Sequence, residues 1–405
     1  MNIAIHTLTS PLHDAAAVDA VSQSFISEIE DELGFALDFK GEDFSGYGSN
    51  DLDIIYVRTG GTEGLFKEIF PQIRGRVILL TSGKSNSLAA SMEILSYLNQ
   101  NGRSGEIIHG SYQYIAERIK VLAQVEAAKK TLDGSRLGII GRPSDWLISS
   151  DADAAAVKDT LGIELVDIPM DELIMEITAG DFTPDNERAE GISKELEENA
   201  PEAIRKYISG AFDIYRALKR LTNRYNLSGL TLRCFDLLST VGNTGCLALA
   251  LLNEEGIPAG CEGDVPALIT MAVGKALTGS CGFQANPSRI DPQTGKILLA
   301  HCTVPFDMVN RYSFNTHFES GTGIAIHGEL PEGQATIFKL SGDLSRSYIC
   351  DAQLIENKYE NNLCRTQIVL KVNDTDYFFR NPIGNHHIVF CGDNSSLFKA
   401  FCSSF

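Results

Sequence analysis

The sequence predicts an α/β protein made of two parallel-sheet domains of the Rossmann or flavodoxin type, followed by a β-rich C-terminal domain. Over roughly the first 280 residues, short apolar runs alternate with amphipathic segments, a pattern typical of parallel sheets covered by helices. Beyond that point strand-like runs dominate, and alternation of apolar and polar residues replaces helical spacing. The last domain is therefore expected to be a sandwich or a partial barrel.

The first domain is expected to span residues 1–133. Its predicted strands are Asn2–Leu8, Asp53–Arg58 and Val77–Thr81, with a possible short fourth at Glu106–His109. Its predicted helices are Asp19–Leu33, Glu63–Phe70 and Ser87–Leu98, because their apolar residues recur at i, i+3 and i+4.

The second domain is expected to span residues 134–285. Its predicted strands are Arg136–Ile140 and Leu230–Phe235, and its predicted helices are Thr183–Ala200, Pro201–Tyr225, Thr244–Glu255 and Asp264–Leu277. The last two helices flank a glycine-rich loop that presents Glu262.

The third domain is expected to span residues 286–405. Its strand-like runs are Lys296–Cys302, Gly323–His327, Ala335–Leu340, Leu363–Val372, Tyr377–Phe379 and Ile388–Cys391. Clusters of Gly, Asn and Asp separate them, which favours antiparallel connections.

Composition excludes several classes of function. The net charge of −19 argues against nucleic acid and against an anionic membrane surface, because both require clustered Lys and Arg. No run approaches the roughly 20 apolar residues of a membrane helix, and no signal peptide is visible. The nine cysteines all lie beyond residue 230 and form no CxxC pair, which indicates reduced thiols and a cytoplasmic protein.

One carboxylate and two imidazoles are the candidate ligands of a divalent metal. Glu262, His301 and His387 each lie at the end of an apolar run, separated by 39 and 86 residues. Such a site would polarise the oxygens of a polyol or carbonyl. A solvated carboxylate and hydrogen-bonded core histidines are the simpler alternative, and the spacing alone does not decide between them.

Four motifs resemble the L-fucose isomerase and L-arabinose isomerase superfamily. They are Cys-Glu-Gly-Asp at 261–264, Leu-Ala-His-Cys-Thr-Val-Pro at 299–305, His-Phe-Glu-Ser-Gly-Thr-Gly at 317–323 and Ile-Gly-Asn-His-His-Ile-Val at 383–389. Over the N-terminal half the likeness is one of architecture more than of motif.

The resemblance implies a metal-dependent sugar isomerase that converts an aldose to a ketose through an enediol, with Mn²⁺ as the cofactor. It implies that Glu262 is both ligand and acid–base group and that His301 and His387 are ligands. It also implies a homotrimer or homohexamer, closed by symmetry.

The chain departs from the superfamily at its second acidic position. The nearest residues there are Gln284 and Asn286, and an amide can bind a metal but cannot act as a base. Asn286 is then expected to orient substrate or metal, and the proton relay would use Asp264, Asp291, Glu319 or a metal-bound water. This departure leaves open an epimerase, another metal-assisted enolisation, or a non-catalytic sugar-binding relative.

The remaining candidates are expected to contact a small sugar substrate: Trp146, His317, Glu319, Asn385 and His386. Trp146 is the only tryptophan, and it could stack on a sugar face or simply pack between domains. His317 and Glu319 lie two apart on a strand-like run, so they share a face that suits either a salt bridge or a polyol.

Overall fold

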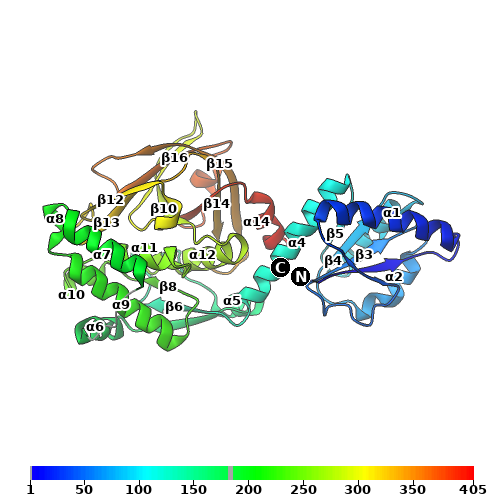
Figure 1. Ribbon diagram of the computed structural model, residues 1–405, viewed down its shortest axis with the longest axis horizontal. Helices are drawn as coiled ribbons and strands as arrows, with labels where there is room; N and C mark the ends of the chain where they lie inside the picture. The colour runs from blue at the N-terminus through cyan, green and yellow to red at the C-terminus, as the bar shows by residue number, and fades with distance from the viewer. Residues whose placement is uncertain (1, 181–185) are drawn as a thin grey trace. The chain divides into compact units, whose positions relative to one another are not determined.

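The computed structural model describes residues 2–180 and 186–405, which fall into two compact units. Unit 1 comprises Met1–Ala127 with Ala400–Phe405, and unit 2 comprises Ala128–Lys399. The boundary expected between residues 285 and 286 falls within Phe283–Asp291, the first strand of the barrel in unit 2 (Figure 1).

Unit 1 is built on a five-stranded parallel sheet in the order β2-β1-β3-β4-β5. Its strands are β1 (Ile3–Leu8), β2 (Asp38–Gly41), β3 (Leu52–Val57), β4 (Val77–Thr81) and β5 (Gly105–Ile108). This doubly wound order is typical of flavodoxin-like domains. The sequence predicted four of these strands and missed β2, which is short and polar.

Helices cover both faces of this sheet. Helices α1 (Ala15–Leu33) and α4 (Tyr112–Leu132) share one apolar cluster with Ile54 of β3. Helices α2 (Glu63–Ile69) and α3 (Ser87–Gln100) share the other with Ile55 of the same strand. Because successive side chains of a strand face opposite sides, β3 is buried on both faces and reads as one apolar run.

Unit 2 begins with a four-stranded parallel sheet in the order β7-β6-β8-β9. Its strands are β6 (Arg136–Ile140), β7 (Glu164–Ile168), β8 (Gly229–Leu232) and β9 (Ala259–Cys261). Its helices are α5 (Ala154–Leu161), α6 (Met170–Ala179), α7 (Glu187–Asn199), α8 (Glu202–Arg205), α9 (Ile208–Tyr225), α10 (Asp236–Thr240), α11 (Cys246–Glu254) and α12 (Val265–Thr278).

Two predicted helices of this part differ from the structure. The predicted helix Pro201–Tyr225 is divided into α8 and α9. The predicted acidic helix that begins at Thr183 corresponds to α7, and its residues 183–185 lie outside the described residues.

The C-terminal strands of unit 2 form a closed antiparallel barrel in the order β10-β11-β16-β15-β14-β17. They are β10 (Phe283–Asp291), β11 (Lys296–His301), β14 (Gly333–Leu340), β15 (Ser347–Lys358), β16 (Thr366–Val372) and β17 (His387–Cys391). Strands β12 (Arg311–Asn315) and β13 (Ala325–Glu329) pair separately, and α14 (Ser395–Cys402) follows β17. The predicted strand at Tyr377–Phe379 is wrong, because these residues lie in the short helix α13 (Asp376–Arg380).

Helix α12 joins the two sheets of unit 2. It contacts β6, β8 and β9 of the parallel sheet and β14 and β17 of the barrel. At Gly274 the helix approaches the barrel so closely that an added Cβ would lie 2.1 Å from Cζ of Phe390. The residues just before α12 therefore lie where sheet and barrel meet.

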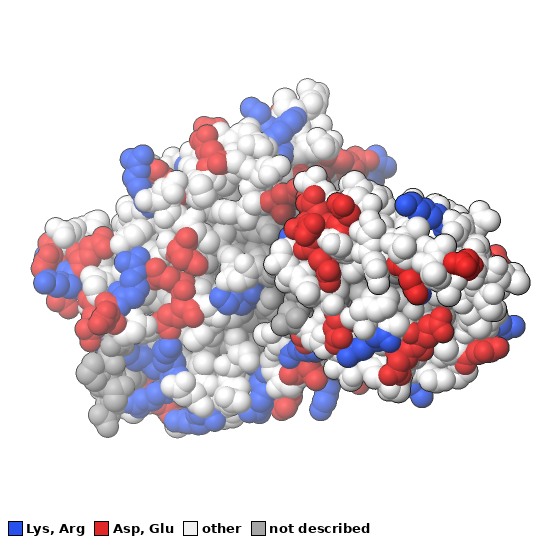
Figure 2. Space-filling model, turned by 45° about the vertical axis from the view of Figure 1, so that its right-hand side comes forward, with Lys and Arg blue, Asp and Glu red and all other residues white. Residues whose placement is uncertain are grey.

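On the face shown in Figure 2, acidic and basic side chains interleave across the surface. None of the helices in residues 2–180 and 186–405 combines the length and apolar character needed to cross a membrane.

Gly274→Ala tests the contact between α12 and the barrel. We expect it to lower the free energy of unfolding by about 1–3 kcal/mol, because the ring of Phe390 must move to admit the methyl group. Urea denaturation followed by circular dichroism measures the change. The matched control is Gly191→Ala in α7, where nothing lies within 4 Å of the added Cβ. Equal stability of the two variants would contradict the close packing.

A candidate metal centre beside a thiol-lined pocket

Glu262, His301 and His386 converge on one point. Their ligand atoms all lie within 4.8 Å of one another. Nε2 of His386 is 3.5 Å from Oε1 of Glu262, and Nε2 of His301 is 3.9 Å from the same oxygen. All three side chains are largely buried, with 9% of Glu262, 3% of His301 and none of His386 exposed. The three residues thus form a compact donor set of two nitrogens and one oxygen.

Barrel register brings the two histidines together. Strand β10 lies between β11 and β17, with Asn286 paired to Ala300 and Ala285 paired to His387. The next residues along those neighbours, His301 and His386, therefore flank β10 on either side. Their ring centroids are 5.4 Å apart.

Glu262 comes from the parallel sheet, in the turn after β9. Its φ of 63° is left-handed, a strained conformation for a residue with a Cβ. The turn is held from both sides. The Glu262 carbonyl accepts a hydrogen bond from the Ser144 amide at 2.9 Å, and the Gln284 side chain accepts one from the Cys261 amide at 2.8 Å. Gln284, one of the two residues expected near the second acidic position, therefore holds the backbone before Glu262.

Trp146 positions the other oxygen of this carboxylate. Its indole Nε1 donates to Oε2 of Glu262 at 2.6 Å, which leaves Oε1 directed toward the histidines. The indole is 53% exposed and meets Phe235 edge to face, with ring centroids 4.9 Å apart. The hydrogen bond to Glu262 was not among the roles that the sequence suggested for Trp146.

Asp264 orients His386 from behind. Nδ1 of His386 donates to Asp264 Oδ2 at 2.8 Å, while Oδ1 caps α12 by accepting from the Ala267 amide. Lys339 of β14 lies 3.6 Å from the same carboxylate. This arrangement directs Nε2 of His386 toward Glu262 and His301, and that buried atom has no hydrogen-bond partner in the described structure. A carboxylate behind an imidazole is the usual support of a metal-binding histidine.

The pKa values of the three residues follow from burial and mutual charge. Burial alone would raise the pKa of Glu262, but the nearby His386, 3.5 Å away, and the charge of His301 hold it at about 2. Burial and the charge of His386 lower the pKa of His301 to about 3. Burial opposes protonation of His386, yet the hydrogen bond to Asp264 and the negative charges of Glu262 and Asp264 raise its pKa to about 9.

The residues fit a divalent metal ion. Two imidazoles and an ionised carboxylate are the ligands that such ions take in proteins, and three protein ligands leave positions open for other oxygens. The unpartnered Nε2 of His386 is the observation that favours this use, because buried polar atoms rarely lack a partner without a reason.

His387, expected as the third ligand, is directed elsewhere. The Tyr377 hydroxyl lies 3.0 Å from Nε2, and Nδ1 donates to the Asn385 carbonyl at 3.0 Å. Both ring nitrogens are therefore occupied, and the geometry favours His386, which was expected to contact substrate. Adjacent residues at a strand end face opposite sides, so only one of the pair can reach Glu262.

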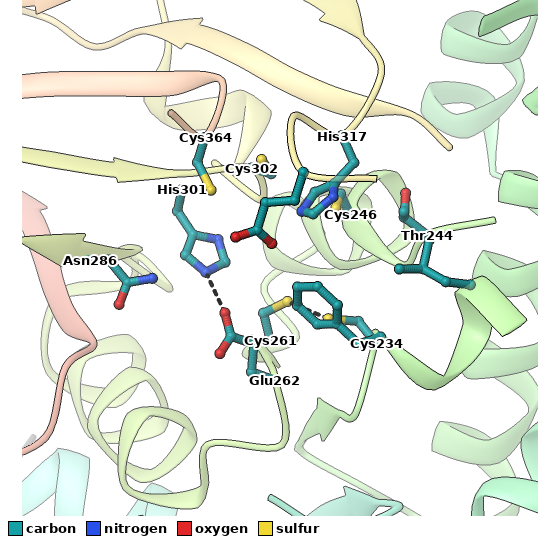
Figure 3. Close-up of a pocket in the computed structure, with 13 residues that line it drawn as sticks. Cys234, Thr244, Cys246, Cys261, Glu262, Asn286, His301, Cys302, His317 and Cys364 are labelled. Carbon is teal, nitrogen blue, oxygen red and sulfur yellow. Dashed lines mark hydrogen bonds and ion pairs between the residues drawn. The ribbon is translucent and has the colours of Figure 1, made fainter. Parts of the chain in front are cut away.

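The donor set borders a pocket in unit 2. Its lining residues are Cys234, Phe235, Leu238, Thr244, Cys246, Cys261, Glu262, Asn286, His301, Cys302, His317, Glu319 and Cys364. In Figure 3, Glu262 and His301 point toward each other and His317 lies across the pocket. Glu319 is a second carboxylate on this wall, and burial followed by the charge of Glu262 raises its pKa.

The turn that carries His317 and Glu319 packs tightly against the rest of the pocket. Gly323, with φ of 71°, lies so close to Thr244 that an added Cβ would be 2.2 Å from Oγ1. Nδ1 of His317 is hydrogen-bonded to the Ser320 hydroxyl at 3.2 Å. Both His317 and Glu319 line the pocket, and their contact with substrate stays a prediction.

The other expected residues have different places. Asp264 does not line the pocket, being fully buried behind His386, so the geometry makes it a positioning residue. Asn286 lines the pocket and accepts a hydrogen bond from Asn385 at 3.0 Å. Asp291, a possible proton relay, bonds to Thr294 at the far end of β10.

The sequence analysis missed Lys339 and the pocket cysteines. Lys339 lies within an apolar run of the sequence, and the lysine itself is the only sign there of a buried charge. Buried cysteines commonly pack like small hydrophobic residues, and no local spacing in the sequence links these five.

The chain is similar to three proteins named sulfoquinovose isomerase. The proteins of Priestia aryabhattai and of Priestia megaterium are each 22% identical over 340 residues, covering 79% of this chain and 73% of theirs. That of Clostridium sp. strain MSTE9 is 27% identical over 139 residues, which cover 31% of this chain and 30% of that protein. No protein-family model matches the chain. These similarities confirm the expectation of an enzyme of the isomerase class.

Separate substitution of the adjacent residues His386 and His387 shows which of the two is a metal ligand and which is structural. We expect His386→Ala to weaken Mn²⁺ binding by at least about tenfold, because it removes a ligand atom. His387→Ala should leave Mn²⁺ affinity nearly unchanged and lower the melting temperature, because it removes the bond to Tyr377. Isothermal titration calorimetry and thermal denaturation measure the two effects. The reverse pattern would restore His387 as the ligand.

Metal affinity should rise with pH. In the metal-free protein the pKa of His386 is about 9, so at neutral pH a proton on Nε2 competes with the cation. Each pH unit between 6.5 and 8.5 should therefore increase Mn²⁺ affinity by up to about tenfold, with release of one proton. Calorimetry in buffers of different ionisation enthalpy counts the protons. An affinity that falls with pH would contradict this arrangement.

Proposed function

We propose that this chain is a metal-dependent aldose–ketose isomerase acting on a hexose-like sugar through an enediol. The observation that carries the proposal is the convergence of Glu262, His301 and His386 beside the pocket, with Nε2 of His386 unpartnered. Similarity to proteins named sulfoquinovose isomerase over most of the chain supports the same reaction type.

The metal would be held by Oε1 of Glu262 and the two Nε2 atoms of His301 and His386. We expect Mn²⁺ because the resemblance to the fucose and arabinose isomerases implies it, and the carboxylate oxygen of Glu262 is a donor that suits this ion. When bound, the cation polarises neighbouring sugar oxygens and stabilises negative charge that develops on them. Trp146 and Asp264 keep the donors aimed at one point, so little reorganisation is needed.

Two carboxylates that line the pocket have different roles in this proposal, one as a metal ligand and the other in proton transfer. Glu262, with a pKa of about 2, stays ionised and suits the role of ligand. Burial and then the charge of Glu262 raise the pKa of Glu319 above that of an ordinary carboxyl, so Glu319 is the better suited of the two to accept and return a proton. We therefore assign to Glu319 the transfer of a proton from C2 of the aldose to C1. Its carboxylate supplies the base that neither Gln284 nor Asn286 can provide.

Asn286 and His317 would orient the sugar. Each has a hydrogen-bonding group at the pocket wall, and each is fixed by a neighbour, Asn385 and Ser320 respectively. Preorganised donors and acceptors of this kind select hydroxyl positions on a ligand.

The substrate we favour is a sugar with an anionic substituent. The relatives are named for sulfoquinovose, a sulfonated aldose. Arg365 is 8% exposed, and its guanidinium bonds to the carbonyls of Thr316 and Asn361, without an ion pair to any described carboxylate. Burial lowers the pKa of nearby His317, and the charge of Arg365 lowers it further. A buried cation next to a pocket residue is a suitable partner for a sulfonate.

An epimerase and a non-catalytic sugar-binding protein are the alternatives. The amides of Gln284 and Asn286 favour the second, since they replace an acidic residue. Solvent deuterium at C1 of a ketose product indicates isomerisation. Exchange at a single carbon without a ketose indicates epimerisation, and binding without exchange indicates a binding protein. A homotrimer or homohexamer remains our expectation, measured by light scattering.

Substitution of Glu319 tests the catalytic assignment. We expect Glu319→Gln to lower kcat by about 10²–10⁴ while Mn²⁺ binding persists, because the proton carrier is lost and the ligands remain. The assay measures ketose formation from sulfoquinovose, with glucose as the unsulfonated comparison. Glu262→Gln should instead weaken Mn²⁺ binding and activity together.

Glu332→Gln, at an exposed residue between β13 and β14, is the matched control and should retain activity. Full activity in Glu319→Gln would place the proton transfer elsewhere. Full activity in Glu262→Gln would place the whole site elsewhere.

A further inference from the structure

Two thiols in the pocket lie next to each other at the base of the metal centre. Five of the nine cysteines line the pocket, and two of these, Cys234 and Cys261, have sulfur atoms 3.0 Å apart. Both side chains are buried, with 6% and 3% exposed, yet both border the pocket (Figure 3). A small solute that enters the pocket can therefore reach them.

The fold brings these two cysteines together. Strands β8 and β9 are parallel neighbours, with Leu232 paired to Cys261, and Cys234 follows β8 by two residues. The intervening Arg233 is held by Asp145 and Asp236, which anchors the turn that presents Cys234. The sulfur atoms need to approach by only about 1 Å to reach the roughly 2.05 Å of a disulfide.

We propose that Cys234 and Cys261 form a reversible oxidation site, and that closure of their disulfide displaces Glu262 from His301 and His386. The oxidant is a small peroxide. One thiolate attacks the peroxide oxygen, which gives a sulfenic acid and, from hydrogen peroxide, water. The other thiol attacks that sulfur and releases a second water. Two thiols are oxidised to one disulfide, and the peroxide is reduced by two electrons.

The displacement follows from the position of Cys261. It directly precedes Glu262, and its backbone amide is held by Gln284. Drawing its sulfur toward Cys234 therefore strains the turn whose left-handed residue carries the ligand oxygen. The effect on metal binding rests on the function proposed above, whereas formation of the disulfide and movement of Glu262 do not.

The single tryptophan reports the movement. Because Trp146 Nε1 donates to Glu262, a shift of that carboxylate should change the fluorescence of the only indole in the chain. The reduced protein is treated with hydrogen peroxide, blocked with N-ethylmaleimide and digested without reduction. We expect mass spectrometry to find a Cys234–Cys261 linked peptide, with a fluorescence change that dithiothreitol reverses. Mn²⁺ affinity should fall by about tenfold or more in the oxidised protein.

Two kinds of variant control the experiment. Cys234→Ser and Cys261→Ser should each abolish the linked peptide and the fluorescence response. Two variants are used so that, if one of them fails to fold, the other still tests the proposal. Cys391→Ser, at the exposed cysteine that ends β17 and does not line the pocket, should retain both. A linkage between other cysteines, or none, would overturn the proposal. A Cys234–Cys261 disulfide with unchanged Trp146 fluorescence would overturn the displacement of Glu262. If the reduced protein does not bind Mn²⁺, that result contradicts the proposed function and leaves the disulfide proposal unaffected.

Discussion

The fully buried carboxylate of Asp264 connects the parts of unit 2 that make the site. One oxygen caps α12, the helix between sheet and barrel, and the other accepts the Nδ1 proton of His386 at the start of β17. Lys339 of β14, itself buried, supplies the compensating charge. A buried charge without partners would cost several kcal/mol, so these three elements must approach together. The position of His386 relative to Glu262, two residues before Asp264, follows from that requirement.

The site lies where a parallel sheet and an antiparallel barrel meet, and each contributes what its geometry allows. The turn after β9 supplies Glu262 from the carboxyl end of the sheet, where open α/β sheets usually bind ligands. The barrel supplies both histidines from strands on either side of β10. Charge is then divided between two carboxylates in different surroundings. His301 and His386 lower the pKa of Glu262 and so keep it ionised. Glu319, at the opposite wall of the pocket, has a raised pKa. In the function we propose, this difference would separate metal binding from proton transfer within one pocket.

Sequence patterns identified the elements whose burial produces a regular signal. The strands β4 and β6 were predicted with the observed bounds, because each contains a run of buried, mainly apolar residues. By contrast, β15, at 12 residues the longest barrel strand, was missed, since most of its side chains are exposed or partly exposed and polar. The aromatic run at Tyr377–Phe379 indicated a strand but forms α13, where Tyr377 stacks on Tyr348 and bonds to His387. Tertiary contacts override local propensity in such short segments.

The sequence by itself determined the α/β class, the change to β structure near residue 280, and Glu262 and His301 as candidate ligands. It indicated this much because hydrophobic periodicity and glycine-rich turns are local properties. Only the tertiary structure decided which histidine of the pair 386–387 joins them. Side chains alternate along a strand, so a shift of one residue in register would exchange the two. The pairing of β17 with β10 and β14, together with the buried Asp264, directs His386 to the metal centre and His387 to Tyr377.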